Sequence, residues 1–441
     1  MADRPSVDSQ AAELAAAFAH FRTLLDRDEL DALQPHGPTA SYTTGVIVWL
    51  LVYQRLHANA SLAAAVADAI EPNGGIVSGR QLSANTGAYS RARQRLKPEV
   101  AEQVADRVFE SLLAVTPPLF AGRRAFVLDG TTLTLAPTPE LRKAYPPATN
   151  QHGSCAWPVA LAVVAHELAS GCALRPELGP MYGPHATGEL HLALRILARL
   201  PARSLLLADR NFGVFAFVHA ATSAGHDVLT RLTEPRFHAL LRSAQTVAAG
   251  EWTLDWTPSP ADRRAHPTLS ADARVRVRLI ERTTADGKPL WLLTTADATA
   301  DDIAATYRRR LDVETDIRDV KITLKTDDIR ARSVAMLVKE LTLGTVAYNL
   351  VVQVRRLAAQ RAHVQPRCLS FAGVWTLVQA ILLRPTEGTP EQWAERFEVV
   401  LRGAAQRKVP NRPGRNYPRL AHARSRKFPS KPRPETDKPQ V

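Results

Sequence analysis

The sequence predicts an α/β fold: a mixed β-sheet with helices on its faces. Apolar segments from Arg124 onward come first in neighbouring pairs and then alternate with helical patterns, which is the element order of such a sheet. A helical region precedes these segments, and a block that alternates with period two interrupts them after residue 235. The expected architecture is a mixed-sheet core, interrupted by a β-rich insertion and preceded by an all-helical amino-terminal domain.

The first 115 residues are expected to be helical. Dense or periodic apolar residues predict helices over Ala11–Leu25 and Thr44–Leu56, and two more follow around Ser61–Ile70 and Lys97–Leu113. The arginine-rich stretch SGRQLSANTGAYSRARQRL separates the last two helices. Because serine and threonine hydroxyls interleaved with arginine suit phosphate contacts, this stretch is a candidate DNA-contacting helix, and a solvated basic helix face is the alternative. The candidate residues are Arg91, Arg93 and Arg95.

Two aspartates follow buried strands. In AFVLDGTTLTLA, an apolar strand leads to Asp129 and a glycine turn, after which a second strand begins. In SLLLADRNFG, the strand Ser204–Ala208 leads to Asp209 and another turn. Open α/β sheets bind their ligands beyond the carboxyl ends of the strands, so both carboxylates are candidate functional groups. Taken singly, each aspartate could also serve only to cap the amides of its turn.

The second half of the chain contains the insertion and a basic tail. Segments such as WTLDW and RVRVRLIE alternate with period two and predict strands over 236–294, and helical patterns resume near Thr299. From Arg402 to the last residue there are 12 Lys or Arg and 2 Asp or Glu, a net +10 of the chain's +13. Such a Pro- and Arg-rich segment is expected to be disordered. The predicted units are 1–115 (helical, DNA-binding), 120–235 (first part of the core), 236–294 (β-rich insertion), 295–400 (catalytic helix and remainder of the core) and 401–441 (basic tail).

The composition indicates a globular protein that binds a polyanion. Charged residues make up 22% and hydrophobic residues 45% of the chain, and the pI is near 10.0. The three cysteines lack metal-ligand spacing and predict a reducing, cytoplasmic setting. The longest apolar run, VIVWLLVY, is shorter than the roughly 18 residues that span a bilayer. The first residues, MADRPSVDSQ, do not resemble a secretory signal, so no membrane partner is expected.

The stretch YRRRLDVETDIRDVKITLK contains four acidic and six basic residues. Treated as one helix with about 100° per residue, it brings four polar residues into an arc of roughly 60° inside the apolar face. These residues are Tyr307, Arg310, Glu314 and Lys321. The other acids fall on the opposite, solvated side, namely Asp312, Asp316 and Asp319. Glu314 is therefore the candidate functional acid of this stretch, and a buried row of ion pairs is the alternative.

Three carboxylates from two strand ends and one helix could hold two divalent cations. Close carboxylates repel one another unless a cation neutralises them, and Mg²⁺ prefers hard oxygen ligands. Two such ions about 3.5–4 Å apart activate a nucleophile and stabilise the leaving oxygen of a phosphoryl transfer. Neighbouring Arg and Lys side chains would hold the phosphates. The expected ligands are Asp129, Asp209 and Glu314, and the expected cofactor is Mg²⁺, with Mn²⁺ as a substitute.

The spacing Y-x2-R-x3-E-x6-K, which begins at Tyr307 and ends at Lys321, resembles the signature of DDE transposases of the insertion-sequence-four group. VLDGTTLTL and LLLADRNFG resemble the other two motif regions of that family and occur in the same order. The interval from Asp209 to Glu314 is long enough for the inserted β domain that these enzymes carry. Because SRARQRL and LSF also match, the resemblance covers most of the chain.

The resemblance implies a ribonuclease H-like core in which Asp129, Asp209 and Glu314 are the catalytic metal ligands. It implies a bacterial enzyme that moves an insertion element by cut and paste: hydrolysis of DNA at the element ends, a hairpin intermediate, and attack of the freed 3′ hydroxyl on target DNA. The implied partners are double-stranded DNA, as terminal inverted repeats and as target, and a second copy of the chain in a synaptic homodimer. Such an enzyme would act in the cytoplasm at the nucleoid.

The resemblance also implies further DNA contacts. Tyr307, Arg310 and Lys321 are expected at the transposon end, near the cleaved phosphate. Members of the family stack a tryptophan of the inserted domain on a flipped base, and Trp252 and Trp256 are the candidates here. Stacking of this kind contributes about 1–3 kcal/mol per base. Packing in the protein core is the alternative for both tryptophans.

Two other functions are compatible with part of the sequence. A transposase-derived DNA-binding protein that has lost catalysis would keep the same fold, but all three acids and their basic neighbours are present here. A phosphatase or phosphotransferase could use Asp129 as its nucleophile. That chemistry usually requires a second acid two residues later, where this chain has Thr131. A DDE transposase is therefore the predicted function.

Overall fold

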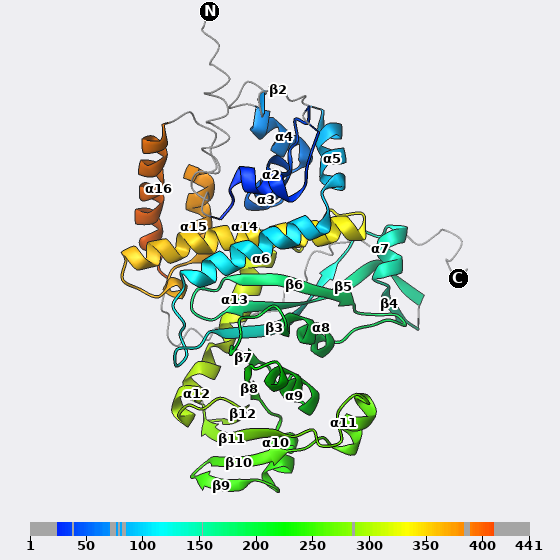
Figure 1. Ribbon diagram of the computed structural model, residues 1–441, viewed down its shortest axis with the longest axis vertical. Helices are drawn as coiled ribbons and strands as arrows, with labels where there is room; N and C mark the ends of the chain where they lie inside the picture. The colour runs from blue at the N-terminus through cyan, green and yellow to red at the C-terminus, as the bar shows by residue number, and fades with distance from the viewer. Residues whose placement is uncertain are drawn as a thin grey trace, which may run out of the picture. The chain divides into compact units, whose positions relative to one another are not determined.

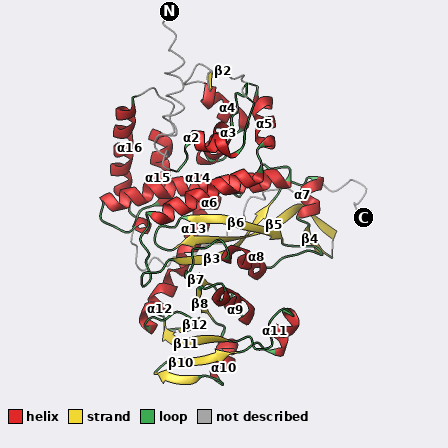
Figure 2. Cartoon of the chain, in the orientation of Figure 1, coloured by secondary structure: helices red, strands yellow, loops and turns green. Residues whose placement is uncertain are grey.

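A mixed β-sheet is the central element of the fold (Figure 1, Figure 2). The computed structural model describes residues 24–37, 39–70, 76–77, 80–81, 85–151, 153–284, 287–382 and 389–409. The described helices and strands belong to one compact unit, Met1–Lys408. The strands of the sheet are, in chain order, β3 (Ala125–Thr134), β4 (Pro147–Asn150), β5 (Gly153–Glu167), β6 (Ala173–Pro180), β7 (Leu205–Ala208), β8 (Asp227–Arg231), β9 (Gln245–Ala248), β10 (Glu251–Trp256), β11 (Val275–Thr283) and β12 (Pro289–Thr294).

The strand order confirms a mixed sheet with helical crossovers. The strands lie in the order β4-β5-β3-β7-β8-β12-β11-β10-β9, and β6 also pairs with β5. β3, β7 and β8 run parallel to one another, and the other pairings are antiparallel. Because parallel neighbours need a crossover, α8 (Glu189–Leu197) leads into β7, and α9 (Phe215–Ser223) joins β7 to β8.

The described part of the amino-terminal region is mostly helical. Its helices are α2 (Arg27–Leu33), α3 (Thr44–Leu56), α4 (Leu62–Ile70), α5 (Thr86–Arg95) and α6 (Pro98–Ala114). The Thr43 and Asn85 side chains accept hydrogen bonds from free N–H groups where α3 and α5 begin. Two short strands, β1 (Ile76–Val77) and β2 (Arg80–Gln81), pair between α4 and α5, so the prediction of an all-helical region is wrong at this point. The predicted helix Ala11–Leu25 lies almost entirely outside the described residues.

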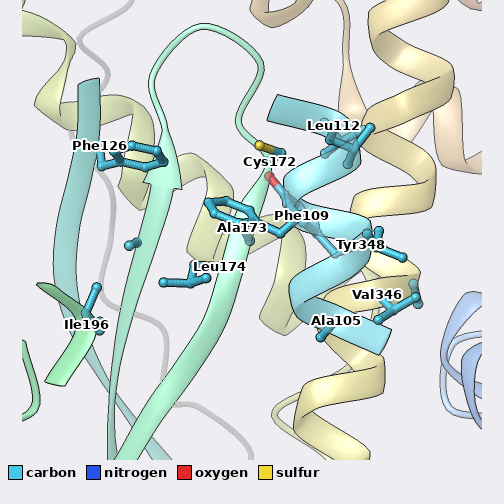
Figure 3. Close-up of a cluster of buried hydrophobic side chains, with 14 of the residues drawn as sticks. Ala105, Phe109, Leu112, Phe126, Cys172, Ala173, Leu174, Ile196, Val346 and Tyr348 are labelled. Carbon is cyan, nitrogen blue, oxygen red and sulfur yellow. The ribbon is translucent and has the colours of Figure 1, made fainter. Parts of the chain in front are cut away.

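A long buried helix connects the amino-terminal helices with the sheet. α14 (Val334–Arg361) runs beside α6 in Figure 1 and also packs against α3 and α16 (Pro390–Ala405). Figure 3 shows side chains of α6 and α14 meeting those of β3 and β6, and the rings of Phe109 and Phe126 lie 6.0 Å apart. By length and composition α14 could cross a membrane, but 83% of its most apolar window is buried, as in the core helix of a globular protein.

The two faces of the central strands belong to different hydrophobic clusters. Phe126 of β3 packs in the cluster that contains α6, α8 and α14. The next residue, Val127, and its neighbour Leu207 of β7 pack with α12 (Ala300–Arg308) and α13 (Asp312–Arg318). Successive side chains of a strand point to opposite faces, which explains the alternation. The odd-numbered side chains of β3 and β7 therefore point to the face of the sheet that α12 and α13 cover.

The segment 236–294 forms the predicted strands, but they are not a separate sheet. β12 pairs antiparallel with β8, with Leu293 opposite Thr230, so β9–β12 extend the central sheet. Two short helices, α10 (Glu234–Leu241) and α11 (Pro260–Ala265), accompany these strands. The segment is therefore an extension of the core sheet at the β8 edge.

The predicted tail begins too early. Residues 401–405 complete α16, where the side chains of Leu401 and Ala404 are buried against the core. The predicted disorder concerns mainly residues 410–441, which lie outside the described residues. The remaining domain boundaries stay predictions. Two further helices, α7 (Pro139–Ala144) and α15 (Phe371–Leu377), complete the set of described α-helices.

The stretch from Ala300 to Thr323 is not one regular helix. α12 ends at Arg308, a 3-10 turn covers Arg309–Leu311, α13 follows, and a π-helical turn covers Asp319–Thr323. The 3-10 turn is tighter than an α-helix and the π turn is wider, so each one rotates the side chains that follow it. The phase predicted for a single α-helix therefore does not hold along this stretch.

Candidate active site

The sheet register brings Asp129 and Asp209 together. β3 and β7 are parallel neighbours in which Val127 is the partner of Leu207, and each aspartate follows two residues later. Since side chains two apart share a face, both carboxylates lie on the face of α12 and α13. Asp209 follows the end of β7, as predicted. Asp129 lies inside β3, which continues through Gly130, so the predicted glycine turn is wrong.

Asp129 is held in a partly buried, acidic environment. Its Oδ1 accepts a hydrogen bond from the Gly130 amide at 2.9 Å. Burial raises the pKa of the Asp129 carboxyl, and the negative charges of Asp209 and Glu314 raise it further. Asp209 Oδ1 accepts a hydrogen bond from the Asn211 amide at 2.8 Å, which fixes the turn after β7. Because the negative charges of these carboxylates repel one another, a cation near them would stabilise the site.

Arg310 supplies a cation between two of the acids. Its Nη2 donates to Glu314 Oε1 at 3.0 Å, and its Nη1 lies 3.9 Å from Asp129 Oδ2. The Glu314 side chain is 59% exposed, whereas that of Arg310 is 17% exposed. The structure therefore brings together β3, the 3-10 turn and α13 through one guanidinium.

Lys321 and Tyr307 lie near different acids of the site. Lys321 Nζ donates to Thr131 Oγ1 at 3.1 Å and to the Thr132 carbonyl at 3.0 Å, which fixes its ammonium group beside β3. Tyr307 lines an open pocket of about 310 Å³ together with Asp209. Burial raises the pKa of Tyr307 to about 12, so this hydroxyl keeps its proton at neutral pH. Four arginines contribute to the same pocket: Arg210, Arg231, Arg308 and Arg310.

A fourth carboxylate, Glu189, adjoins the site and was not singled out from the sequence. Glu189 is the first residue of α8, and its side chain lies directly against the Cα of Gly130, where any added Cβ would collide with it. Burial raises the pKa of Glu189, followed by the charges of Asp209 and Asp129. Acids are common in the first turn of a helix because they complement its dipole, which gives this residue no distinctive sequence signal.

The donor set fits a hard divalent cation in its chemistry. Asp129, Asp209 and Glu314 offer carboxylate oxygens, the ligands that Mg²⁺ and Mn²⁺ prefer. Within the described residues, no group of three or more His, Cys, Asp or Glu side chains is close enough to hold a metal ion. The acids are thus near one another but not gathered around one point.

Two acids that were expected on the solvated side are buried. Asp316 is fully buried and Asp319 is 6% exposed, while Asp312 is only partly exposed. Burial alone would raise the pKa of Asp316, but the Arg367 guanidinium beside it holds that pKa below its usual value. His166 Nδ1 lies 3.5 Å from Asp316 Oδ2. The prediction failed because the stretch changes helix type three times, which shifts the phase of its side chains, and because Arg367 and Tyr348 cover Asp316.

The two candidate tryptophans lie in the core beneath the extended sheet. Trp256 is 8% exposed and its ring meets Phe215 edge to face at 5.4 Å. Trp252 is partly buried, and its ring lies 5.8 Å from that of Phe237. These contacts support the core-packing alternative for Trp256, whose ring is enclosed, and for the buried part of Trp252.

The three arginines of α5 differ in their surroundings. Arg91 and Arg95 are exposed, whereas Arg93 Nη2 lies 3.6 Å from Glu340 Oε1 of α14. Lys339 Nζ donates to three backbone carbonyls around the end of α5, which fixes this helix on α14. Arg91 and Arg95 are therefore available for contacts with a polyanion, and the DNA-binding role of α5 stays a prediction.

Sequence comparison identifies the family. Residues 120–350, just over half of the chain, match the Transposase DDE domain, and the chain belongs to this family. Transposase InsG for insertion sequence element IS4, from Escherichia coli (strain K12), is 25% identical over 354 residues, which cover 78% of each protein. These matches confirm a DDE transposase of the insertion-sequence-four group, an enzyme that cleaves DNA and transfers its strands.

One solved structure gives a weaker likeness. The piggyBac transposase synaptic complex with hairpin DNA aligns with 87% of this chain and 85% of its own chain, at 10% identity and a TM-score of 0.42. A likeness at this level carries no argument about the fold or the site of this chain.

Proposed function

We propose that Asp129, Asp209 and Glu314 are the catalytic acids of this transposase and hold two divalent cations, Mg²⁺ or Mn²⁺. The observation that carries this proposal is the Arg310 guanidinium between the carboxylates of Asp129 and Glu314. Neighbouring carboxylates repel one another unless a positive charge lies near them, and a guanidinium and a divalent cation are both suited to that position. Asp129, Asp209 and Glu314 would hold the cations through their carboxylate oxygens, and Arg310 would lie beside them.

The surrounding side chains would bind the DNA backbone. Bound cations would supply an activated nucleophile and neutralise charge at the leaving oxygen. Arg310 would donate to phosphate oxygens in the bidentate manner of guanidinium groups. The ammonium group of Lys321 is fixed beside β3 and would meet a second phosphate. Tyr307 would donate a hydrogen bond in the pocket beside Asp209.

The proposed core is ribonuclease H-like. The order β6-β5-β3-β7-β8, with β5 antiparallel to its neighbours and the acids on β3 and after β7, supports this assignment. The proposed reaction begins with water attack on the phosphodiester at each element end, which frees a 3′ hydroxyl. That hydroxyl would attack the opposite strand at the element boundary, which forms a hairpin and releases the flanking DNA with a 3′ hydroxyl. A second water would hydrolyse the hairpin, and the regenerated 3′ hydroxyl would attack a target phosphodiester and displace its 3′ oxygen.

The proposed setting follows from this reaction. Joining two element ends to one target requires that both ends be held at once, which a synaptic homodimer on terminal inverted repeats would achieve. The chromosome is the substrate, so the enzyme would act in the bacterial cytoplasm at the nucleoid. Arg91 and Arg95 are the proposed contacts of α5 with the element ends, because their side chains are exposed.

The test is cleavage of DNA that carries the element ends. Alanine at Asp129, Asp209 or Glu314 is expected to abolish Mg²⁺-dependent cleavage and to leave end binding intact, because only the metal ligands are lost. Asp301→Ala is the matched control, since Asp301 is an exposed acid on the neighbouring helix α12. Undiminished cleavage by any of the three variants would remove that residue from the site. If the unaltered protein bound the ends without cutting them, it would be a catalytically decayed remnant.

A further inference from the structure

Behind Glu314, α13 is tied to the rest of the core by a buried ion pair. Asp316 accepts two hydrogen bonds from Arg367, one to Oδ1 from Nη1 at 2.9 Å and one to Oδ2 from Nη2 at 2.8 Å. The hydroxyl of Tyr348 on α14 lies 3.3 Å from Asp316 Oδ1. A bidentate pair of this kind fixes the orientation of the carboxylate as well as its position.

Arg367 links this carboxylate to a fixed point of the sheet. Its Nε donates to the Leu168 carbonyl at 2.7 Å, and its Nη2 also donates to the Glu167 carbonyl at 3.2 Å. Glu167 is the last residue of β5, and Leu168 begins the connection from β5 to β6. Arg309, in the 3-10 turn before α13, donates to the same Leu168 carbonyl at 2.9 Å. The helix that carries Glu314 is thus tied to one end of β5 by two arginines.

The buried ion pair and Glu314 belong to the same short helix, α13. Asp316 follows Glu314 by two residues, or about 200° around a helix, so the two side chains leave α13 on opposite sides. α13 has seven residues and lies between a 3-10 turn and a π turn, so its backbone alone does not fix its rotation. A rotation of α13 would release Asp316 from Arg367 and turn Glu314 away from Asp129.

We propose that the Asp316–Arg367 pair positions Glu314 for metal binding by fixing the rotation of α13. This inference rests on the proposed role of Glu314. Asp316 and Arg367 are positioning residues, because neither reaches the substrate side of the helix. The pair is a specific link and not only a source of stability, since buried ion pairs add little net stability over apolar residues of similar size.

The test uses Arg367→Lys, which retains the positive charge but cannot form the bidentate pair. The readouts are the single-turnover cleavage rate, the Mg²⁺ concentration at half-maximal rate, and the affinity for DNA ends. We expect a rate about 10- to 100-fold lower and a higher Mg²⁺ requirement, with end binding within about twofold, because small misplacements of a catalytic group have effects of this size. Asp227→Asn is the matched control, because Asp227 also pairs with an arginine, Arg123, at the start of β8.

If Arg367→Lys does not fold, the double variant Asp316→Leu/Arg367→Met replaces the pair by apolar groups and is tested in the same way. A wild-type rate and Mg²⁺ requirement in the folded variant, while Glu314→Ala is inactive, would overturn the positioning role and leave the proposed site intact. Cleavage by Glu314→Ala would overturn both, because Glu314 would then have no metal to hold.

Discussion

The two sides of α13 carry acids in opposite surroundings. Glu314 is 59% exposed and shares one guanidinium with Asp129. Asp316 is fully buried and has both oxygens bonded to Arg367. An exposed ion pair contributes about 0–1 kcal/mol and is easily exchanged, whereas breaking a buried pair costs about 3–5 kcal/mol. The exposed pair is therefore the more easily broken of the two, and the buried pair ties α13 to the core.

The largest expected effect is on stability, and it comes from replacing Asp319, a buried acid in the π turn that follows α13. Burial raises its pKa to about 6, well above the ordinary value of 3.8, although Arg355 and Arg318 oppose this. Ionised Asp319 thus destabilises the folded state at neutral pH, by up to roughly 3 kcal/mol at 1.36 kcal/mol per pKa unit. Between pH 3.8 and about 6, Asp319 keeps its proton in the folded protein but has lost it in the unfolded chain. The contribution of Asp319 to the free energy of unfolding is therefore lost as the pH rises through this range.

Asp319→Asn is accordingly expected to raise the free energy of unfolding at pH 7 and to have little effect at pH 3.5. Urea unfolding at both pH values measures the difference. Asp328→Asn, an exposed acid in the loop before α14, is the matched control. A destabilised Asp319→Asn at pH 7 would mean that the buried side depends on a charge at this position, as it does at Asp316.

Gly130→Ala provides a smaller effect and tests the strand that carries Asp129, the acid that shares Arg310 with Glu314. The new Cβ would collide with the Glu189 side chain, so Glu189 or β3 must move next to Asp129. We expect cleavage to fall about 10- to 100-fold, with end binding retained, because the acids would be displaced by a fraction of an ångström or more. Single-turnover cleavage measures the loss.

Two variants show whether the collision is the cause. Gly188→Ala is the matched control, since a Cβ at Gly188 would meet nothing within 4 Å. Adding Glu189→Ala to Gly130→Ala removes the colliding side chain, and recovery of the rate would assign the defect to its displacement. Normal cleavage by Gly130→Ala alone would show that the site tolerates a displacement of β3 next to Asp129, contrary to this prediction.

Local patterns in the sequence predicted much of the fold. The helix Thr44–Leu56 was predicted with the observed bounds because it is densely apolar, and the strand Ser204–Ala208 was predicted to within one residue. Asp209 could be singled out because a turn follows its strand directly. The continuity of β3 through Gly130 could not be predicted, because it depends on antiparallel pairing with β5, a distant part of the chain.

The surroundings of the site depend on partners far away in the sequence. Phasing selected Glu314, which does meet Arg310, but it assigned Asp316 to solvent. Arg367, the partner that buries Asp316, lies 51 residues further on, and no local pattern connects the two. Glu189 was missed for a similar reason, since only the packing of α8 on β3 brings it to Gly130. Local patterns thus singled out the three acids as candidates, and tertiary packing determined the surroundings of each acid.

The central claim is that Glu314 is a metal ligand, and Glu314→Cys tests it most directly. A thiolate binds Mg²⁺ poorly but accepts softer ions such as Mn²⁺ and Cd²⁺. Cleavage of element ends by Glu314→Cys is expected to be absent in Mg²⁺ and to return in Mn²⁺ or Cd²⁺, while Glu314→Ala stays inactive in every ion. Cleavage by Glu314→Cys in Mg²⁺ at the rate of the unaltered protein would contradict the account.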